Sequence, residues 1–142
     1  MSNQRFHFKR AWLWPLLVAL TIIWASNHGR VATPHFTTYI SDFDKVAHFS
    51  IYALLATLLV RLGPGRAAPW IAIAVVSLFG VTDEWHQSYV PGRSCDVMDW
   101  TADTLGAVCG VALYRGWAWY RRALEGPLLR GPVAIDGLAK AG

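Results

Sequence analysis

Hydrophobic residues along the chain gather into four long segments separated by shorter, more polar stretches. The segments cover residues 11–26, 46–62, 70–90 and 100–119. Each is close to the ~20 residues that a helix needs to cross the hydrocarbon core of a bilayer, although the first is short for that length. The pattern predicts an all-α fold, an integral membrane four-helix bundle over residues 1–125. It predicts a loosely ordered cytoplasmic tail, rich in Gly and Pro, over residues 126–142.

Positive charges are distributed unevenly between the two sides that four spans would define. Ten of the 13 Lys and Arg residues fall at the N-terminus, between the second and third segments, or at the C-terminus. Cytoplasmic loops of membrane proteins carry an excess of Lys and Arg. We therefore expect both termini in the cytoplasm and a multi-pass protein of the bacterial cytoplasmic (inner) membrane. All eight Trp residues fall at or near segment ends, as in an interfacial aromatic belt.

The first segment also has features of a secretory signal peptide, because basic residues precede a short apolar run. Cleavage would leave three spans and place the N-terminus outside. Pro15 and the bulky Trp24 fit a cleavable signal poorly. We therefore expect the segment to be retained as a span.

Composition favours the membrane class and excludes several functions. The chain is 54% hydrophobic and 15% charged, against about 25% charged in soluble domains. Its net charge is +4, but the basic residues form no stripe or long run, so we expect no nucleic-acid partner. P-loop, GxSxG, HExxH and Rossmann glycine motifs are absent. We expect no cofactor and no metal. A metal site formed by Asp83, Glu84, His48 and Asp99 is a minor alternative.

Ionisable residues interrupt three of the hydrophobic segments near their outer ends. At 100° per residue, each segment places its polar residues on one helical face. These residues are Lys45, His48 and Tyr52 for the second segment, Asp83, Glu84 and Gln87 for the third, and Asp99 and Asp103 for the fourth, where Lys45 and Asp99 stand one residue before the segment begins. Ionisable groups are costly when they face lipid, so the three faces should meet one another or a water-filled cleft. We predict an outward-facing polar site.

The residue types indicate roles in such a site. Arg93, between the third and fourth segments, can bind phosphate or carboxylate with two hydrogen bonds, and Lys45 adds a point charge. Glu84, Asp83 and His48 are the candidate catalytic groups for proton transfer. The other expected binding residues are Gln87, Asp96, Asp99 and Asp103. The GxxxG step over residues 106–110 should let a neighbouring helix approach closely.

Three functional hypotheses stay open. In the first, the site binds or processes an anionic, lipid-linked or amphiphilic molecule of the cell envelope. In the second, the polar residues only clamp the helices of a membrane scaffold or partner subunit, since acids suit the first turn of a helix and Arg93 can pair with a nearby Asp. In the third, the intramembrane carboxylates serve a small transporter or proton relay.

Two stretches resemble the VanZ-like family of small bacterial membrane proteins. They are "DKVAHFSIYALLATLL" and "TDEWHQSYVPGRSCDVMDWTADTLGAVCG", and the resemblance covers about residues 40–115. The family pattern falls on Asp44, Lys45, His48, Asp83, Glu84, Gln87, Pro91, Arg93, Asp96, Asp99, Asp103 and Gly106. Many members have Asn at the position of Asp103, so this chain has an additional ionisable group there.

The resemblance implies a role at the cell envelope. The family's namesake is linked to low-level resistance to the glycopeptide antibiotic teicoplanin. Some members have been labelled acyl- or butyryl-transferases, but no cofactor-binding residue in this chain supports that activity. Whether the protein is an enzyme, its substrate and its oligomeric state stay open at this point.

Overall fold

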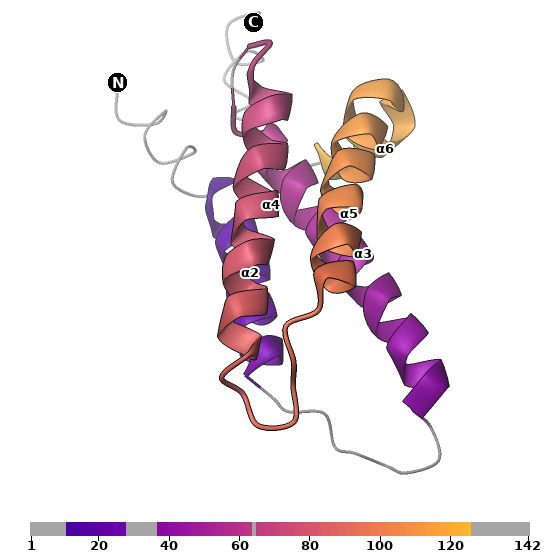
Figure 1. The fold of residues 1–142 in the computed structure, drawn as a ribbon. Helices are drawn as coiled ribbons and strands as arrows, with labels where there is room; N and C mark the ends of the chain where they lie inside the picture. Colours follow the sequence, from indigo (N-terminus) through magenta and orange to yellow (C-terminus); the bar gives the residue numbers. More distant parts are fainter. Residues whose placement is uncertain (1–10, 28–36, 64, 126–142) are drawn as a thin grey trace, which may run out of the picture.

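The chain is helical wherever its computed structural model describes it, in residues 11–27, 37–63 and 65–125, apart from short connections. These ranges contain five helices and no strand, which confirms the prediction of an all-α protein (Figure 1). The helices are α2 (Leu13–Ser26), α3 (Thr37–Val60), α4 (Ala68–Gln87), α5 (Val97–Gly116) and α6 (Ala118–Leu124). The tail predicted for residues 126–142 lies outside the described part of the chain.

Local sequence explains where three of the helices begin. Pro15 and Pro69 stand in the first turns of α2 and α4, where the N–H that proline lacks would have no partner within the helix. Asp96 precedes α5, and its side chain accepts a hydrogen bond from the Met98 N–H at 2.8 Å. This is the side-chain cap that satisfies a free N–H at a helix start.

Two helix boundaries differ from the hydrophobic segments. Helix α3 begins at Thr37, well before residue 46, because a run of polar residues ends the hydrophobic pattern without ending the helix. The segment over residues 100–119 is divided into α5 and α6 at Trp117, whose backbone is extended with φ −111° and ψ 101°. A count of apolar residues does not register such a break, because Trp117 and its neighbours are themselves apolar.

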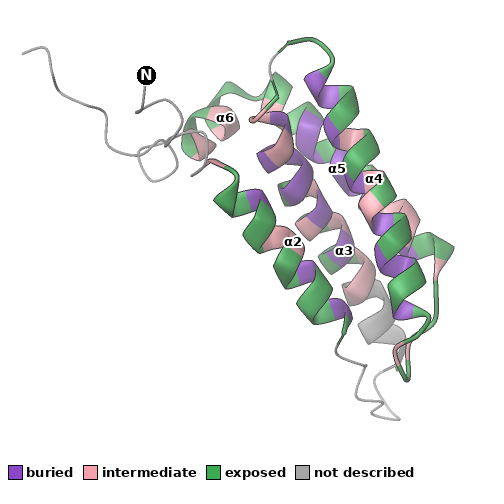
Figure 2. Ribbon diagram, turned by 90° about the vertical axis from the view of Figure 1, so that its left-hand side faces the viewer, coloured by how far each residue is buried: buried purple, intermediate pink, exposed green. Residues whose placement is uncertain are grey.

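The most extensive helix contact joins α3 and α5, while α4 packs on α5 and α2 lies against α3 and α4 (Figure 1). Glycines explain the close approach of α3 and α5. A Cβ atom at Gly106 or Gly110 would collide with the backbone of Phe49 or Ala53 on α3, which confirms the role predicted for the GxxxG step. The buried residues lie on the sides of the helices that face one another (Figure 2).

The outward faces of the helices are rich in exposed apolar side chains (Figure 2). Among the largest are Leu20, Trp24, Trp70, Ile71, Leu78 and Trp85. In the described ranges, however, no helix combines the length and the apolar character needed to cross a membrane. The helices cover most of the four predicted segments, with the boundary differences given above, whereas their insertion in a membrane stays a prediction.

Candidate functional site

The polar faces predicted for three segments meet between α3, α4 and α5. The structure brings together side chains that are far apart in the sequence, and most of them are buried. The buried members are His48, Asp83, Glu84, Gln87, Asp99 and Asp103. Lys45, Arg93 and Asp96 lie at the edge of this group, partly exposed. We call these nine residues the polar site.

Lys45 joins α3 to the start of α5. Its Nζ lies 3.1 Å from Oδ1 of Asp99 and 3.4 Å from Oδ2 of Asp96. The Lys45 ammonium therefore forms an ion pair with Asp99 and has Asp96 as a second acidic partner. An anion entering the site would compete with these two carboxylates for Lys45.

His48 and Asp103 form a second, deeper link between α3 and α5. Nδ1 of His48 lies 2.9 Å from Oδ1 of Asp103, and both side chains are buried. The imidazole stacks on the ring of Tyr52, with 6.0 Å between centroids. When Nδ1 donates its hydrogen to Asp103, Nε2 is left as an acceptor. The carboxylate thereby orients the ring, as in sites where histidine accepts a proton or binds a metal.

Asp83 and Glu84 are neighbours on α4 but have different partners. Oδ2 of Asp83 accepts hydrogen bonds from the Tyr52 hydroxyl at 3.2 Å and from Nε2 of Gln87 at 3.0 Å. Oε2 of Glu84 instead accepts one from the Asp96 N–H at 2.7 Å, at the start of α5. Tyr52 lies on the polar face predicted for the second segment, one helical turn after His48, but no feature of the sequence assigned it a role.

Two cavities meet at Arg93. The larger, of about 170 Å³, is lined by Thr21, Ile22, Ala25 and Ser26 of α2, by Ala47 and Ile51 of α3, and by Asp44, His48, Tyr52, Asp83 and Arg93. The smaller, of about 80 Å³, is lined by Lys45, Gln87, Gly92, Arg93, Ser94, Asp96 and Asp99. Nε of Arg93 is buried and has no hydrogen-bond partner among the described residues. The arrangement can therefore accept an anion that carries an apolar group.

A comparison with protein families matches residues 1–120 to the family described as VanZ/LLP1. The match spans well over half of the 142 residues. The chain belongs to the VanZ/LLP1 family. The resemblance seen in the two sequence stretches is thereby confirmed. No match was found among curated proteins or among solved structures.

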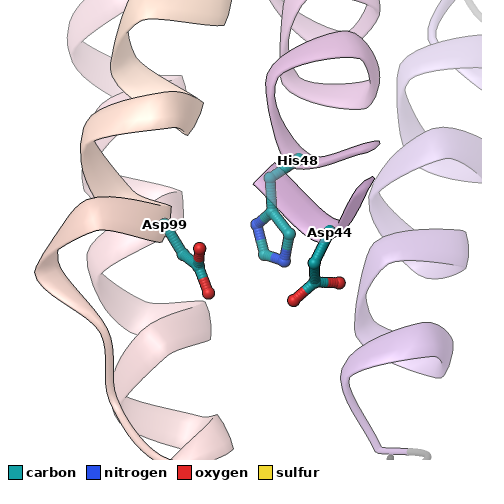
Figure 3. A group of neighbouring side chains, drawn as sticks. All are labelled: Asp44, His48 and Asp99. Atoms are coloured by element: carbon teal, nitrogen blue, oxygen red, sulfur yellow. The ribbon is translucent and has the colours of Figure 1, made fainter. Parts of the chain in front are cut away.

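One position of the VanZ-like sequence pattern, Asp44, had no role assigned to it from the sequence. In the structure of this VanZ/LLP1 member it lines the larger cavity, and the imidazole of His48 lies between the carboxylates of Asp44 and Asp99 (Figure 3). Asp44 precedes His48 by one helical turn, and this spacing could have placed it at the site from the sequence alone. The oxygen and nitrogen atoms of this group lie within 4.8 Å of one another, as do those of His48, Glu84 and Asp103. Either group has the donors to hold a cation.

Proposed function

We propose that this VanZ/LLP1-family protein is embedded in the bacterial inner membrane, with both termini in the cytoplasm and the polar site toward the outer side. The exposed Leu, Ile and Trp side chains on the outward faces support this placement, since large exposed apolar surfaces mark membrane or protein contacts. Asp83, Glu84, Asp99, Asp103 and His48 lower the average hydropathy of α3, α4 and α5, yet their side chains are buried. An apolar exterior around a polar interior is the arrangement expected of ionisable groups in a membrane protein.

We further propose that the polar site binds the anionic head group of an amphiphilic or lipid-linked envelope molecule. The observation that carries this proposal is the cavity of about 170 Å³, which is lined by uncharged side chains toward α2 (Thr21, Ile22, Ala25 and Ser26) and is charged toward Arg93 and His48. Arg93 would hold the anion, and Lys45 would contribute at the rim. His48, Glu84 and Asp83 are the groups available for any proton transfer. A contribution to teicoplanin resistance would be one consequence of acting on such a molecule.

The test replaces the arginine that joins both cavities. We expect Arg93→Ala to lose the anionic lipids that copurify with the wild-type protein, and to abolish any change that the protein causes in pools of lipid-linked envelope intermediates. Mass spectrometry measures both, and teicoplanin susceptibility of the host is measured in parallel. Arg122→Ala removes an exposed positive charge from α6 and should change nothing. Identical lipid profiles for wild type and a folded Arg93→Ala variant would refute the proposal.

A second candidate function, a non-enzymatic scaffold, is favoured by the links between helices. Lys45 with Asp99, His48 with Asp103, and Tyr52 with Asp83 tie α3 to α5 and α4. A clamp of this kind predicts that Asp103→Asn lowers the melting temperature in detergent, while Arg93→Ala changes neither the bound lipid nor the stability. Copurification of a partner protein at fixed stoichiometry would support the scaffold.

A further inference from the structure

Three buried side chains, one from each of α3, α4 and α5, converge inside the polar site. They are His48, Glu84 and Asp103, with exposed fractions of 8%, 3% and 0%. One donor atom from each lies within 4.8 Å of the others. No two of these residues are close in sequence, so the group exists only through the packing of the three helices.

Two oxygens of this group have no hydrogen-bond partner. Oε1 of Glu84 and Oδ2 of Asp103 are buried and unpartnered among the described residues. The second oxygen of each carboxylate is held in place, by the Asp96 N–H for Glu84 and by His48 for Asp103. Buried polar atoms are nearly always hydrogen-bonded, and an unpaired one is costly. Two oriented carboxylates, each with an oxygen that no described residue contacts by a hydrogen bond, can bind a group that accepts electron pairs.

The charges nearby also favour a cation. Four carboxylates are buried in the site, those of Asp83, Glu84, Asp99 and Asp103. Lys45 offsets Asp99, and Arg93, which lines a cavity with Asp83, supplies a second positive charge, so two carboxylates are left when His48 is neutral. Burying unpaired charges is strongly unfavourable. A divalent ion would neutralise the remaining carboxylates at the position where they meet.

We propose that His48, Glu84 and Asp103 bind a divalent transition-metal ion. An imidazole and two carboxylates, without a thiolate, suit Zn²⁺ or Mn²⁺. Ligand atoms lie about 2.0–2.2 Å from such ions, so two of them are about 3.0 Å apart at the right angles of an octahedral site and about 3.4 Å apart at the tetrahedral angle usual for Zn²⁺. Nδ1 of His48 and Oδ1 of Asp103 are already 2.9 Å apart. An ion bound to both atoms would lie to one side of the line between them, and their hydrogen bond would be replaced after a rotation of the two side chains.

The other candidate group, Asp44, His48 and Asp99, is less suited to an ion. Oδ1 of Asp99 already accepts a hydrogen bond from Lys45 at 3.1 Å. A metal ion bound there would compete with the ammonium and would be repelled by it. The deeper group contains no Lys or Arg contact in the described structure, so its carboxylates are available to an ion.

This inference goes beyond the proposed function and does not depend on it. Metal content is measured without any lipid, and Arg93→Ala should retain the ion even where it loses the lipid. With the ion bound, His48 acts as a ligand, and the ion offers an open position where an anion or a water molecule can bind.

The experiment measures metal in the full-length protein purified in detergent. The protein is equilibrated with ZnCl₂ or MnCl₂, desalted, and analysed by inductively coupled plasma mass spectrometry. We expect about one ion per wild-type chain with at least one of the two metals, and about tenfold or more less bound metal in the Glu84→Gln/Asp103→Asn double variant, which lacks two of the three ligands. A wild-type protein that holds neither metal, or a folded double variant that holds as much as wild type, overturns the proposal.

Two controls separate this site from its neighbours. Asp83→Asn removes the adjacent buried carboxylate of α4, and Asp99→Asn removes a member of the other group; both should keep the ion. Loss of the ion in Asp99→Asn, together with retention of the ion in the double variant, contradicts the assignment.

A second measurement tests the site if the double variant does not fold. X-ray absorption of the Zn²⁺-loaded wild-type protein identifies the atoms bound to the ion. Nitrogen and oxygen neighbours at about 2.0–2.2 Å support the site, whereas sulfur at about 2.3 Å places the ion at a cysteine and rejects it.

Discussion

Lys45 and Asp99 form an ion pair whose two members are buried to different extents, so the loss of each should have a different cost. The side chain of Lys45 is 32% exposed, whereas that of Asp99 is 5% exposed. Without Asp99, Lys45 can turn toward water at small cost. Without Lys45, the carboxylate of Asp99 stays buried next to other acids, and an unpaired buried charge is strongly destabilising.

The effects of Lys45→Ala and Asp99→Ala on stability should therefore differ in size, and each should depend strongly on whether the other residue is present. We expect Lys45→Ala to lower the free energy of unfolding by about 1–3 kcal/mol, and to cost less than half of that in an Asp99→Ala background. Unfolding of the purified protein in detergent measures the double-mutant cycle. Arg66→Ala, which removes an exposed charge at the other end of α3 and α4, should be close to neutral. Additive effects would show that the ion pair contributes nothing.

Helical spacing alone predicted which residues converge, but not how they pair. The faces holding His48 and Asp103 were both identified, and the structure joins them. The separate partners of Asp83 and Glu84 were not foreseen, because adjacent residues on a helix point about 100° apart and their partners depend on where the other helices stand. The roles assigned to these residues in binding and proton transfer stay predictions.

At the scale of elements, the contact between α3 and α5 positions the polar site. Gly106 and Gly110 follow Asp103 along α5 at helical spacing, and both lie against the backbone of α3. The same close approach places His48 beside Asp103. Small residues at helix interfaces allow this kind of contact, and the added van der Waals packing stabilises it.

A methyl group at this contact should be disruptive. We expect Gly110→Ala to lower stability by about 3 kcal/mol, because the backbone of Ala53 blocks the new Cβ and cannot move aside alone. Gly116→Ala is the matched control in the same helix, since nothing lies within 4 Å of its Cβ position; it should be neutral or stabilising by up to about 1 kcal/mol. Thermal unfolding in detergent compares the two. Equal effects would mean that α3 and α5 do not touch through these glycines.

Hydrophobic patterning located the helices better than it located their ends. It marked α2 and α4 to within a few residues, because apolar and helical stretches coincide there. It missed the first turns of α3, where Asp and Lys residues are helical but polar, and the break before α6. Both errors arise because the pattern reports burial or lipid contact and not backbone conformation.

At the scale of the whole molecule, the exposed apolar surface and the buried charges invert the usual arrangement of a water-soluble domain. Large side chains such as Trp70 and Trp85 are 72% and 66% exposed, while Asp83 and Asp103 are 4% and 0% exposed. A soluble protein seldom exposes so much contiguous apolar surface without a partner. A bilayer would cover this surface on all sides, whereas a protein partner would cover one side.

The two cysteines can test whether lipid or water covers the apolar faces of the helices. Cys95, in the connection between α4 and α5, and Cys109, within α5, are both free and exposed in the structure. In water both thiols would react with a maleimide. In the proposed membrane orientation only Cys95 reaches the outer aqueous side, because lipid covers Cys109.

We therefore expect a membrane-impermeant maleimide to label the Cys109→Ala variant, which retains Cys95, in intact spheroplasts. The Cys95→Ala variant, which retains Cys109, should stay unlabelled until the protein is unfolded in SDS, since lipid or detergent covers its thiol while the protein is folded. Gel shift of the labelled protein gives the readout, and labelling after SDS treatment controls for expression. If Cys95 reacts only after the spheroplasts are lysed, the polar site faces the cytoplasm. Equal reaction of both thiols in spheroplasts would instead mean that the apolar faces are open to water, and the proposed insertion would be wrong.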